Sequence, residues 1–348
     1  MDSILLLVHT ESDGTLARTA LEALTAACSF AGELTVGLIG SAVQPAANRI
    51  SECGARFLAV TGEAFAQARY ATDAAAAEAL CKASGASLVL APSTSRWARA
   101  LPGVAYRLGG RVDTHATATA ARGGAPATSS ASAFDSPAVA VTRWFYRQRM
   151  EAVLTRTSRP WFVLLDPGCY APWEETVGTA AVEAVTLDAP ATRTTVVGVQ
   201  APHSDEQTIR PDAKLLMVAG AGWTKKQADG GVHVAEAETL ILGFLRAAKA
   251  SLGGSKSLVD LGGEGQAVLR CMTHMNQIGQ TGSTPRHAKG LSTCCHGEEP
   301  HVVGWRFVSQ RRAINLDANC GWARGKADVL YVADAFEVMR HVNRLMEA

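Results

Sequence analysis

Two glycines flank a pair of polar side chains in the segment 277–282, which reads Gln-Ile-Gly-Gln-Thr-Gly. Because glycine tolerates backbone angles that other residues avoid, Gly279 and Gly282 let the chain bend close to a bound molecule. The amide of Gln280 and the hydroxyl of Thr281 would then face that molecule as hydrogen-bonding groups. The pattern is typical of a ligand-binding bend, although a tight surface turn has the same composition.

Farther along the chain, His301, Asn315 and Asp317 are polar residues that could serve the same ligand. Asn315 and Asp317 stand at and just after the end of a strand-like run at 312–315, as residues of the following loop. We therefore expect them at the carboxyl edge of a parallel sheet, where α/β proteins bind ligands. Taken alone, His301 has a second interpretation as a structural histidine. No pair or triad of residues has convincing spacing for general acid–base catalysis.

The turn Ala-Gly-Ala-Gly at 219–222 follows an apolar strand, as the first turn of a nucleotide-binding unit does. It lacks the third glycine of the dinucleotide fingerprint, and no Lys-Ser or Lys-Thr pair follows it at P-loop spacing. The residues themselves therefore favour neither NAD(P) nor a P-loop nucleotide, and the turn can equally serve packing.

Eight cysteines are spread along the chain without a Cys-x-x-Cys pair, which argues against a disulfide framework and a zinc ribbon. Cys294, Cys295 and His296, with His301 and Cys320 beyond them, form the cluster that suggests a metal. Their spacing fits no common zinc or iron–sulfur signature. A metal site stays open as an alternative.

Apolar strand-like runs alternate with helical segments through the first half of the chain, which predicts βαβ units around a parallel sheet. The predicted strands are residues 4–9, 34–39, 57–60 and 87–91, and the predicted helices are 15–27, 43–53, 71–83 and 97–108. Three further strand-like runs, at 138–145, 150–155 and 161–165, predict an antiparallel extension of that sheet. A loop at 122–132 precedes them.

A second domain is predicted after residues 186–212, a stretch with several prolines, threonines and aspartates and no helical period. The predicted elements beyond it are strands at 214–219, 312–315 and 329–332 and helices at 235–251 and 333–346. We therefore predict an N-terminal α/β domain over residues 1–190, a linker over 191–212 and a C-terminal domain over 213–348.

The composition is that of an ordinary globular protein, with 47% hydrophobic and 19% charged residues. A formal net charge of +1 provides no electrostatic basis for nucleic-acid binding. No apolar run approaches the roughly 18–20 residues that span a bilayer, and the N-terminus lacks the basic region of a signal peptide. We expect a cytoplasmic protein that binds no nucleic acid and is not an integral membrane protein.

The order of these motifs resembles the FAD domain of electron-transfer flavoprotein α subunits. The resemblance rests on Gly-Ser-Lys at 254–256, Gln-Ile-Gly-Gln-Thr-Gly at 277–282, Gly297 with His301, Ala-Ile-Asn-Leu-Asp at 313–317, and the stretch 327–338. The first half is similar to the α/β domain of the same family at 89–94 and 100–105. The resemblance implies an N-terminal parallel-sheet, nucleotide-hydrolase-like domain at the subunit interface and a C-terminal FAD-binding, Rossmann-like α/β domain.

In such a protein the Thr281 hydroxyl would lie near N5 of the flavin. His301 would lie near O2, where negative charge collects when the ring is reduced. Gly279 and Gln280 would approach the flavin through backbone and amide groups. The resemblance further assigns Ser255, His296 and Gly297 to the ribityl and pyrophosphate contacts, Asn315 and Asp328 to the adenosine end, and Lys256 and Gly282 to the same cofactor site.

The resemblance implies an electron carrier without substrate chemistry of its own. FAD would accept electrons from a partner dehydrogenase of the acyl-CoA or N-methyl amino-acid type and pass them on singly to a membrane quinone oxidoreductase. The partner within the family's heterodimer is a β subunit, which completes the FAD crevice and commonly binds AMP. The sequence identifies neither the donor dehydrogenase nor a bifurcating role.

Three departures from the family pattern indicate a divergent member. Lys256 stands where the family usually has arginine, which keeps the charge but loses the planar fork of a guanidinium. The turn 219–223 lacks the family's arginine, for which Lys225 or Lys226 is the available substitute. His296 replaces a serine beside two cysteines.

The alternatives are a nucleotide-binding or regulatory module that lost flavin chemistry, and a metal protein built on the cysteine cluster described above.

Overall fold

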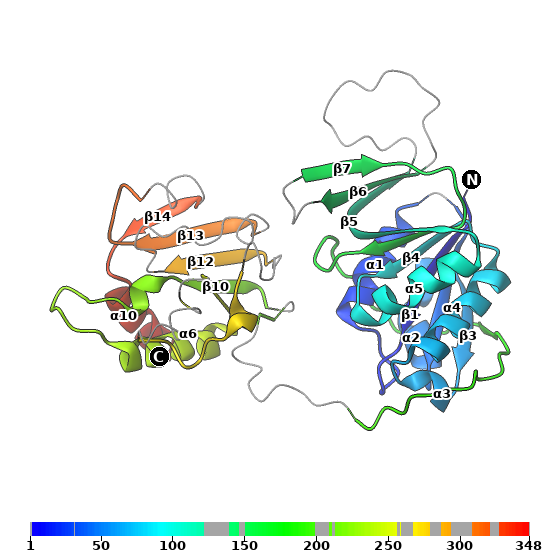
Figure 1. Ribbon diagram of the computed structural model, residues 1–348, viewed down its shortest axis with the longest axis horizontal. Coiled ribbons are helices and arrows are strands. Elements are labelled where there is room, and N and C mark those ends of the chain that lie inside the picture. The colour runs from blue at the N-terminus through cyan, green and yellow to red at the C-terminus, as the bar shows by residue number, and fades with distance from the viewer. Residues whose placement is uncertain are drawn as a thin grey trace, which may run out of the picture. The chain divides into compact units, whose positions relative to one another are not determined.

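The chain folds into two α/β units, Met1–Val199 and Gln200–Ala348, each built on its own sheet (Figure 1). The computed structural model describes residues 2–30, 32–121, 139–145, 150–198, 209–210, 213–255, 258, 267–278, 287–293, 308–320 and 327–347. The division between the units falls within the predicted linker, residues 191–212, whose bounds stay a prediction.

Unit 1 contains a nine-stranded sheet in the order β7-β6-β5-β8-β4-β1-β2-β3-β9. Its strands are β1 (Ile4–His9), β2 (Leu34–Gly40), β3 (Arg56–Thr61), β4 (Leu88–Pro92), β5 (Arg111–Ala121), β6 (Val139–Phe145), β7 (Met150–Leu154), β8 (Trp161–Leu165) and β9 (Val182–Ala184). β1 pairs in parallel with β2 on one side and with β4 on the other. The predicted parallel sheet of the first half is therefore confirmed.

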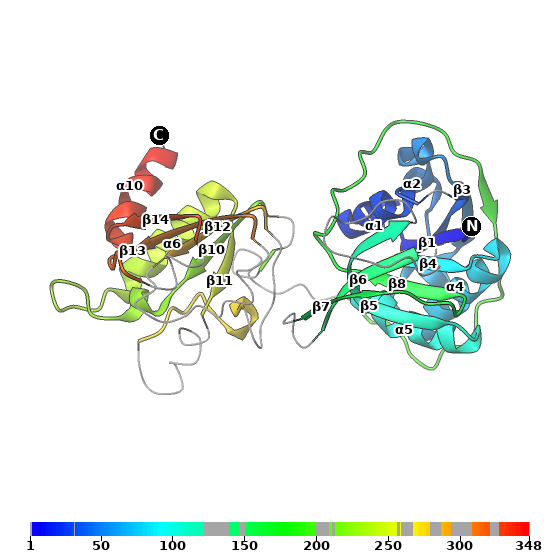
Figure 2. The same ribbon diagram turned by 90° about the horizontal axis from the view of Figure 1, so that it is seen from above.

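Helices cover both faces of this sheet, as Figure 2 shows for α1 and α2 on one side and α4 and α5 on the other. The helices are α1 (Arg18–Cys28), α2 (Gln44–Arg49), α3 (Glu63–Ala66), α4 (Tyr70–Ser84) and α5 (Ser95–Arg107), with a 3-10 turn η1 (Ser51–Cys53). In β1, Leu6 packs in the same cluster as Leu24 of α1. Its neighbours Leu5 and Leu7 pack in the cluster of Leu80 from α4. Because β1 is buried on both faces, its run of apolar residues is uninterrupted.

The antiparallel extension consists of β5, β6 and β7, with β6 antiparallel to both of its neighbours. The prediction was wrong for β8, which lies between β4 and β5 and pairs in parallel with both. β5 was not predicted, because its threonines and alanines carry little apolar signal. The predicted loop at 122–132 lies outside the described residues.

Unit 2 contains a five-stranded, all-parallel sheet in the order β11-β10-β12-β13-β14. Its elements are β10 (Leu215–Ala219), η3 (Ala221–Thr224), α6 (Val234–Ala248), β11 (Ser251–Gly254), η5 (His274–Asn276), β12 (Lys289–Thr293), β13 (Gln310–Asn315), β14 (Val329–Val332) and α10 (Ala335–Glu347). α6 and α10 pack on the same face of the sheet (Figure 1). The first strand of this sheet is β10. β11 pairs with it on one side, and β12, β13 and β14 follow in order on the other.

Two strands of unit 2 were not predicted, because their residues are small or polar. The predicted helix at 235–251 ends at Ala248, where Lys249 adopts a left-handed backbone with φ of 48°. The next residues then form β11, with the sequence Ser-Leu-Gly-Gly, and β12 reads Lys-Gly-Leu-Ser-Thr. Both strands lie directly beside β10, so pairing with its apolar run makes them strands. Both units combine a largely or wholly parallel sheet with helices packed on it, as the predicted fold class requires.

The thiols of Cys28, the last residue of α1, and Cys53, in η1, interact at the edge of a core cluster in unit 1. A hydrogen bond from the Cys28 thiol lowers the pKa of Cys53 to about 7, against the opposing effect of burial. Burial instead raises the pKa of the Cys81 thiol in α4 to about 12.

We therefore expect Cys53 to react with iodoacetamide with a midpoint at about pH 7, because the thiolate is the nucleophile. Its thiolate population grows as the pH rises through that value. Replacing Cys28 by alanine removes the donor and should slow labelling of Cys53 at neutral pH by roughly tenfold. Peptide mass spectrometry measures the rate, with Cys81 as the unreactive internal control. Equal rates for Cys53 in both proteins would contradict the interaction.

Candidate functional site

The carboxyl edge of the sheet in unit 2 gathers the ends of five parallel strands. β10 ends at Ala219, β11 at Gly254, β12 at Thr293, β13 at Asn315 and β14 at Val332. Between β10 and β12 the strand order reverses direction, because β11 and β12 lie on opposite sides of β10. In open α/β sheets, ligands bind outside the carboxyl ends of the strands at such a reversal. The topology therefore makes this edge the candidate site.

At the reversal point, the small-residue turn after β10 lies beside the end of β12. The backbone N–H of Gly220 donates to the carbonyl of Thr293 at 2.9 Å. The following residues, Ala-Gly-Trp-Thr, form the buried 3-10 turn η3. Since Gly220 and Gly222 carry no side chain beyond hydrogen, the backbone of this turn can come close to a ligand.

Two of the predicted site residues lie at this carboxyl edge, and both are buried polar residues. Ser255 follows β11 directly and is 1% exposed; its backbone N–H donates to the Ala219 carbonyl at 3.2 Å. Its hydroxyl accepts the backbone N–H of Leu258 at 3.4 Å. Asn315 is the last residue of β13, is 3% exposed, and accepts the Asp317 N–H at 2.9 Å. Polar side chains buried at the end of an apolar sheet suit a polar ligand.

Asp328, by contrast, precedes β14 and lies at the amino edge of the sheet. Its carboxylate accepts the backbone N–H of Arg311 at 2.7 Å and the Arg311 guanidinium at 3.1 Å. The backbone N–H is the main cause of the lowered pKa of Asp328, with the guanidinium second. Arg311 stands near the start of β13, whereas Asn315 ends that strand. The structure therefore does not bring Asp328 together with Ser255 and Asn315.

Asp334 was not among the predicted site residues, yet it follows β14 at the carboxyl edge. Its Oδ1 accepts the backbone N–H of Glu337 at 3.0 Å, at the beginning of α10. The signal that could have found it is the same as for Asn315: a polar residue directly after a strand and before a helix.

The remaining predicted residues lie outside the described part of the chain. They are Lys256, Gly279, Gln280, Thr281, Gly282, His296, Gly297 and His301. The described residues that lead into their segments nevertheless reach the carboxyl edge. Ile278 donates its N–H to the Gly254 carbonyl at 3.2 Å beside β11, and Thr293 ends β12.

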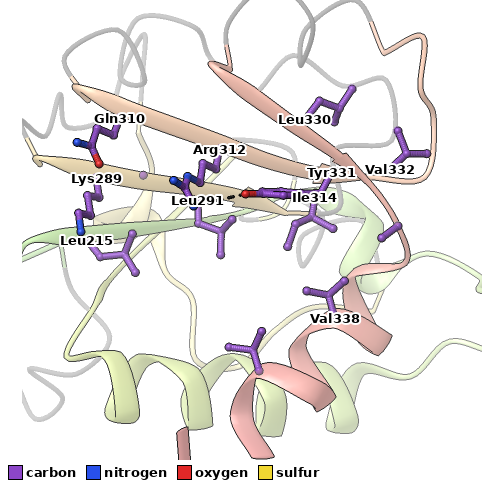
Figure 3. A pocket seen from close by; sticks show the side chains of 13 residues that line it. Leu215, Lys289, Leu291, Gln310, Arg312, Ile314, Leu330, Tyr331, Val332 and Val338 are labelled. Carbon is purple, nitrogen blue, oxygen red and sulfur yellow. Dashed lines mark hydrogen bonds between the residues drawn. The ribbon is translucent and has the colours of Figure 1, made fainter. Parts of the chain in front are cut away.

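A cavity of about 730 Å³ opens on another part of unit 2, on the face of β12, β13 and β14 that carries α10 (Figure 3). Lys289, Arg312, Tyr331 and Val338 are among its lining residues, and the Tyr331 hydroxyl accepts from Arg312 at 3.4 Å. None of the predicted site residues that the structure describes lines it. The cavity reaches the carboxyl edge only at the end of β14, through Val332 and Ala333, and does not include the reversal point between β10 and β12.

In unit 1, a cavity of about 780 Å³ lies at the carboxyl ends of β1, β2 and β4, and His9 and Trp97 line it. The two rings stack with centroids 3.9 Å apart. His9 Nε2 lies 3.4 Å from a carboxylate oxygen of the fully buried Asp73. Asp73 also accepts hydrogen bonds from both Nε and Nη2 of Arg96, at 2.6 to 3.0 Å. Burial lowers the pKa of His9 to about 4, so the ring is neutral at pH 7. The cluster ties the end of β1 to α4 and α5.

Within the described ranges, no group of three or more histidine, cysteine or acidic side chains is placed to hold a metal ion. Cys320 is a buried free thiol, while Cys294, Cys295 and His296 lie outside those ranges. The metal alternative therefore stays a hypothesis. Among the described helices, none combines the length and hydropathy required to cross a bilayer.

Comparison with known proteins matches the first unit to a described family. The sequence model of the electron transfer flavoprotein domain matches residues 4–190, which is more than half of the chain. No curated protein matches the chain. The matched residues lie in unit 1, and the candidate edge in unit 2 lies beyond them.

Proposed function

The chain belongs to the electron transfer flavoprotein family, and from this premise we propose that it is the α subunit of a heterodimeric electron carrier that holds FAD. The family relationship supports an electron carrier rather than a catalyst. One observation supports the α subunit in particular: beyond the matched domain, the chain adds a second parallel sheet with buried polar residues at its reversal point.

The described residues at the carboxyl edge fit FAD. The small-residue turn at 220–222 leaves room for the pyrophosphate to approach the backbone. The buried Ser255 and Asn315 provide hydrogen-bonding groups on either side of that turn. The carboxylate of Asp334, at the end of β14, suits the hydroxyls of a ribose. When bound, FAD supplies the redox chemistry, taking up electrons from a donor and releasing them singly.

The flavin end of the proposed site depends on residues outside the described part of the chain. By the resemblance of their motifs, the Thr281 hydroxyl would contact N5 and His301 would contact O2 of the ring. Their task would be to donate hydrogen bonds where negative charge develops. The segments that carry them start at Ile278 and Thr293, on the candidate edge.

The proposal includes the partners that such a carrier needs. A β subunit would complete the crevice and hold AMP, and a flavin-dependent dehydrogenase of the acyl-CoA or N-methyl amino-acid type would be the donor. A membrane quinone oxidoreductase would be the acceptor, with the carrier itself in the cytoplasm. The chain offers no substrate chemistry of its own in this role.

Co-expression with its β subunit, followed by flavin quantification, tests the proposal. The purified heterodimer should contain about one FAD, show a yellow colour, and bleach on reduction by a donor dehydrogenase. A folded heterodimer that takes up no flavin would contradict the proposal and favour the nucleotide-binding module. Metal analysis of the same sample, with and without chelator, decides on the metal alternative.

Removing the Thr281 hydroxyl or the His301 imidazole should make the reduction potential of the flavin more negative. Loss of a hydrogen bond to a charged group costs about 1.5–3 kcal/mol, which corresponds to roughly 30–60 mV for two electrons. We expect a shift of this order in Thr281→Ala and in His301→Ala, measured by redox titration of the visible spectrum. His341→Ala, on α10 near the C-terminus, is the control and should leave the potential unchanged. Unchanged potentials in both test variants would place the ring elsewhere.

A further inference from the structure

A buried tryptophan and threonine connect the turn after β10 to the end of β12 at the reversal point. Trp223 Nε1 donates to Thr293 Oγ1 at 2.8 Å, and both residues are fully buried. The Thr293 hydroxyl in turn donates to the Val218 carbonyl at 3.1 Å. Together with the backbone bond from Gly220 to Thr293 at 2.9 Å, these contacts join the turn after β10 to the end of β12.

The same tryptophan also reaches the start of α10. Its ring packs on Phe336, with centroids 4.6 Å apart. Phe336 stands two residues after Asp334, the polar residue that follows β14 at the candidate edge. Trp223 lies in the turn after β10. Its side chain contacts two other segments that border the edge, the end of β12 and the start of α10.

A polar pair at this place does more than fill space, because apolar residues of the same volume pack a core equally well. The hydrogen bond adds a preference for one position of the end of β12 relative to the turn. If the end of β12 moves relative to the turn, the indole N–H or the hydroxyl loses its partner inside the core, which is unfavourable. Loops that cradle a ligand bind it better when their spacing is fixed in advance.

We infer that the Trp223–Thr293 hydrogen bond is a positioning element that holds the turn after β10 and the end of β12 at the spacing needed by the phosphate-bearing part of the cofactor. This inference rests on the proposed FAD function. Neither residue has to touch the cofactor. Their effect is exerted through the turn at 220–222 and through the end of β12 at Thr293.

Thr293→Val tests the inference, because valine keeps the shape of threonine but lacks its hydroxyl. In the heterodimer stripped of flavin, titration with FAD by quenching of flavin fluorescence should give a Kd about tenfold higher than that of the parent protein. Thr293→Ser restores the hydroxyl and should return the Kd to within about twofold of the parent.

Asn343→Leu is the matched control for a merely structural effect. Its amide donates to the Leu240 carbonyl at 2.9 Å and joins α10 to α6, also inside the core. It should lower the thermal midpoint about as much as Thr293→Val but leave the Kd for FAD unchanged. The inference is overturned if Thr293→Val binds FAD as the parent does, or if Asn343→Leu raises the Kd equally. If the parent heterodimer itself binds no FAD, the proposed function fails and this inference fails with it.

Discussion

Replacing Asp73 by asparagine should lower the free energy of unfolding of unit 1 by about 3–5 kcal/mol, the range found when one partner of a buried ion pair is removed. Asp73 is fully buried and accepts hydrogen bonds from both Nε and Nη2 of Arg96. Arg99 lies 3.7 Å away and His9 lies 3.4 Å away. In the variant, the Arg96 charge keeps neutral acceptors, the amide oxygen of the introduced asparagine and backbone carbonyls, but loses the opposing charge.

Urea unfolding followed by tryptophan fluorescence measures this effect, because Trp97 stacks on His9 within the same cluster. Because the chain has two units, a single transition should not be assumed, and unit 2 needs its own probe. Glu78→Gln, in the same helix α4, is the control. Glu78 pairs with Lys82 and Arg107 near the surface, and such pairs contribute about 0–1 kcal/mol. Equal urea midpoints for Asp73→Asn and the parent protein would show that the cluster does not stabilise unit 1.

The sequence predicts an element well where the residues of that element alone decide its structure. β1 and β14 have the predicted bounds, and α4 and α10 differ from the predictions by one or two residues at their ends. β1 is an uninterrupted apolar run because helices cover both of its faces. α10 has its apolar residues at helical spacing because one face packs on α6.

Strands whose structure depends on a distant partner could not be predicted. β11 consists of serine, leucine and two glycines, and β12 holds lysine, glycine, serine and threonine around one leucine. Neither has a period-2 apolar pattern, and each is a strand because it pairs in parallel with β10. The parallel position of β8 has the same cause: its apolar run indicates a strand but not its neighbours.

The candidate site shows the same division between local and distant information. Asn315 was identified from its position at a strand end and Ser255 from the family resemblance, and the structure has both at the carboxyl edge. The Trp223–Thr293 contact joins residues 70 positions apart in the sequence, so no local motif could predict it. Asp328 also stands next to a strand, but before it rather than after it. In a parallel sheet that difference moves a side chain from one edge to the other.

This difference leads to opposite expectations for Asp334 and Asp328. Asp334→Ser keeps a hydroxyl to cap α10, since serine is a good N-cap residue, but withdraws the carboxylate from the edge. If that carboxylate accepts a ribose hydroxyl, its loss should weaken FAD binding by about 10–100-fold, the equivalent of about 1.5–3 kcal/mol. Asp328→Ser removes the ion pair with Arg311 at the amino edge and should leave the Kd for FAD within about twofold of the parent.

Equilibrium titration of the flavin-stripped heterodimer with FAD compares the two variants directly, and their thermal midpoints show whether either has lost structure. Because each variant replaces one aspartate by serine next to β14, the pair differs mainly in which edge of the sheet loses a carboxylate. A higher Kd for FAD in Asp334→Ser alone would place the adenosine end at the carboxyl edge, together with Asn315. A higher Kd for FAD in Asp328→Ser alone would restore the assignment made from the family resemblance. The adenosine would then have to extend to the opposite end of the strand. That second outcome conflicts with the way open parallel sheets bind ligands, so it would count against the edge as the FAD site.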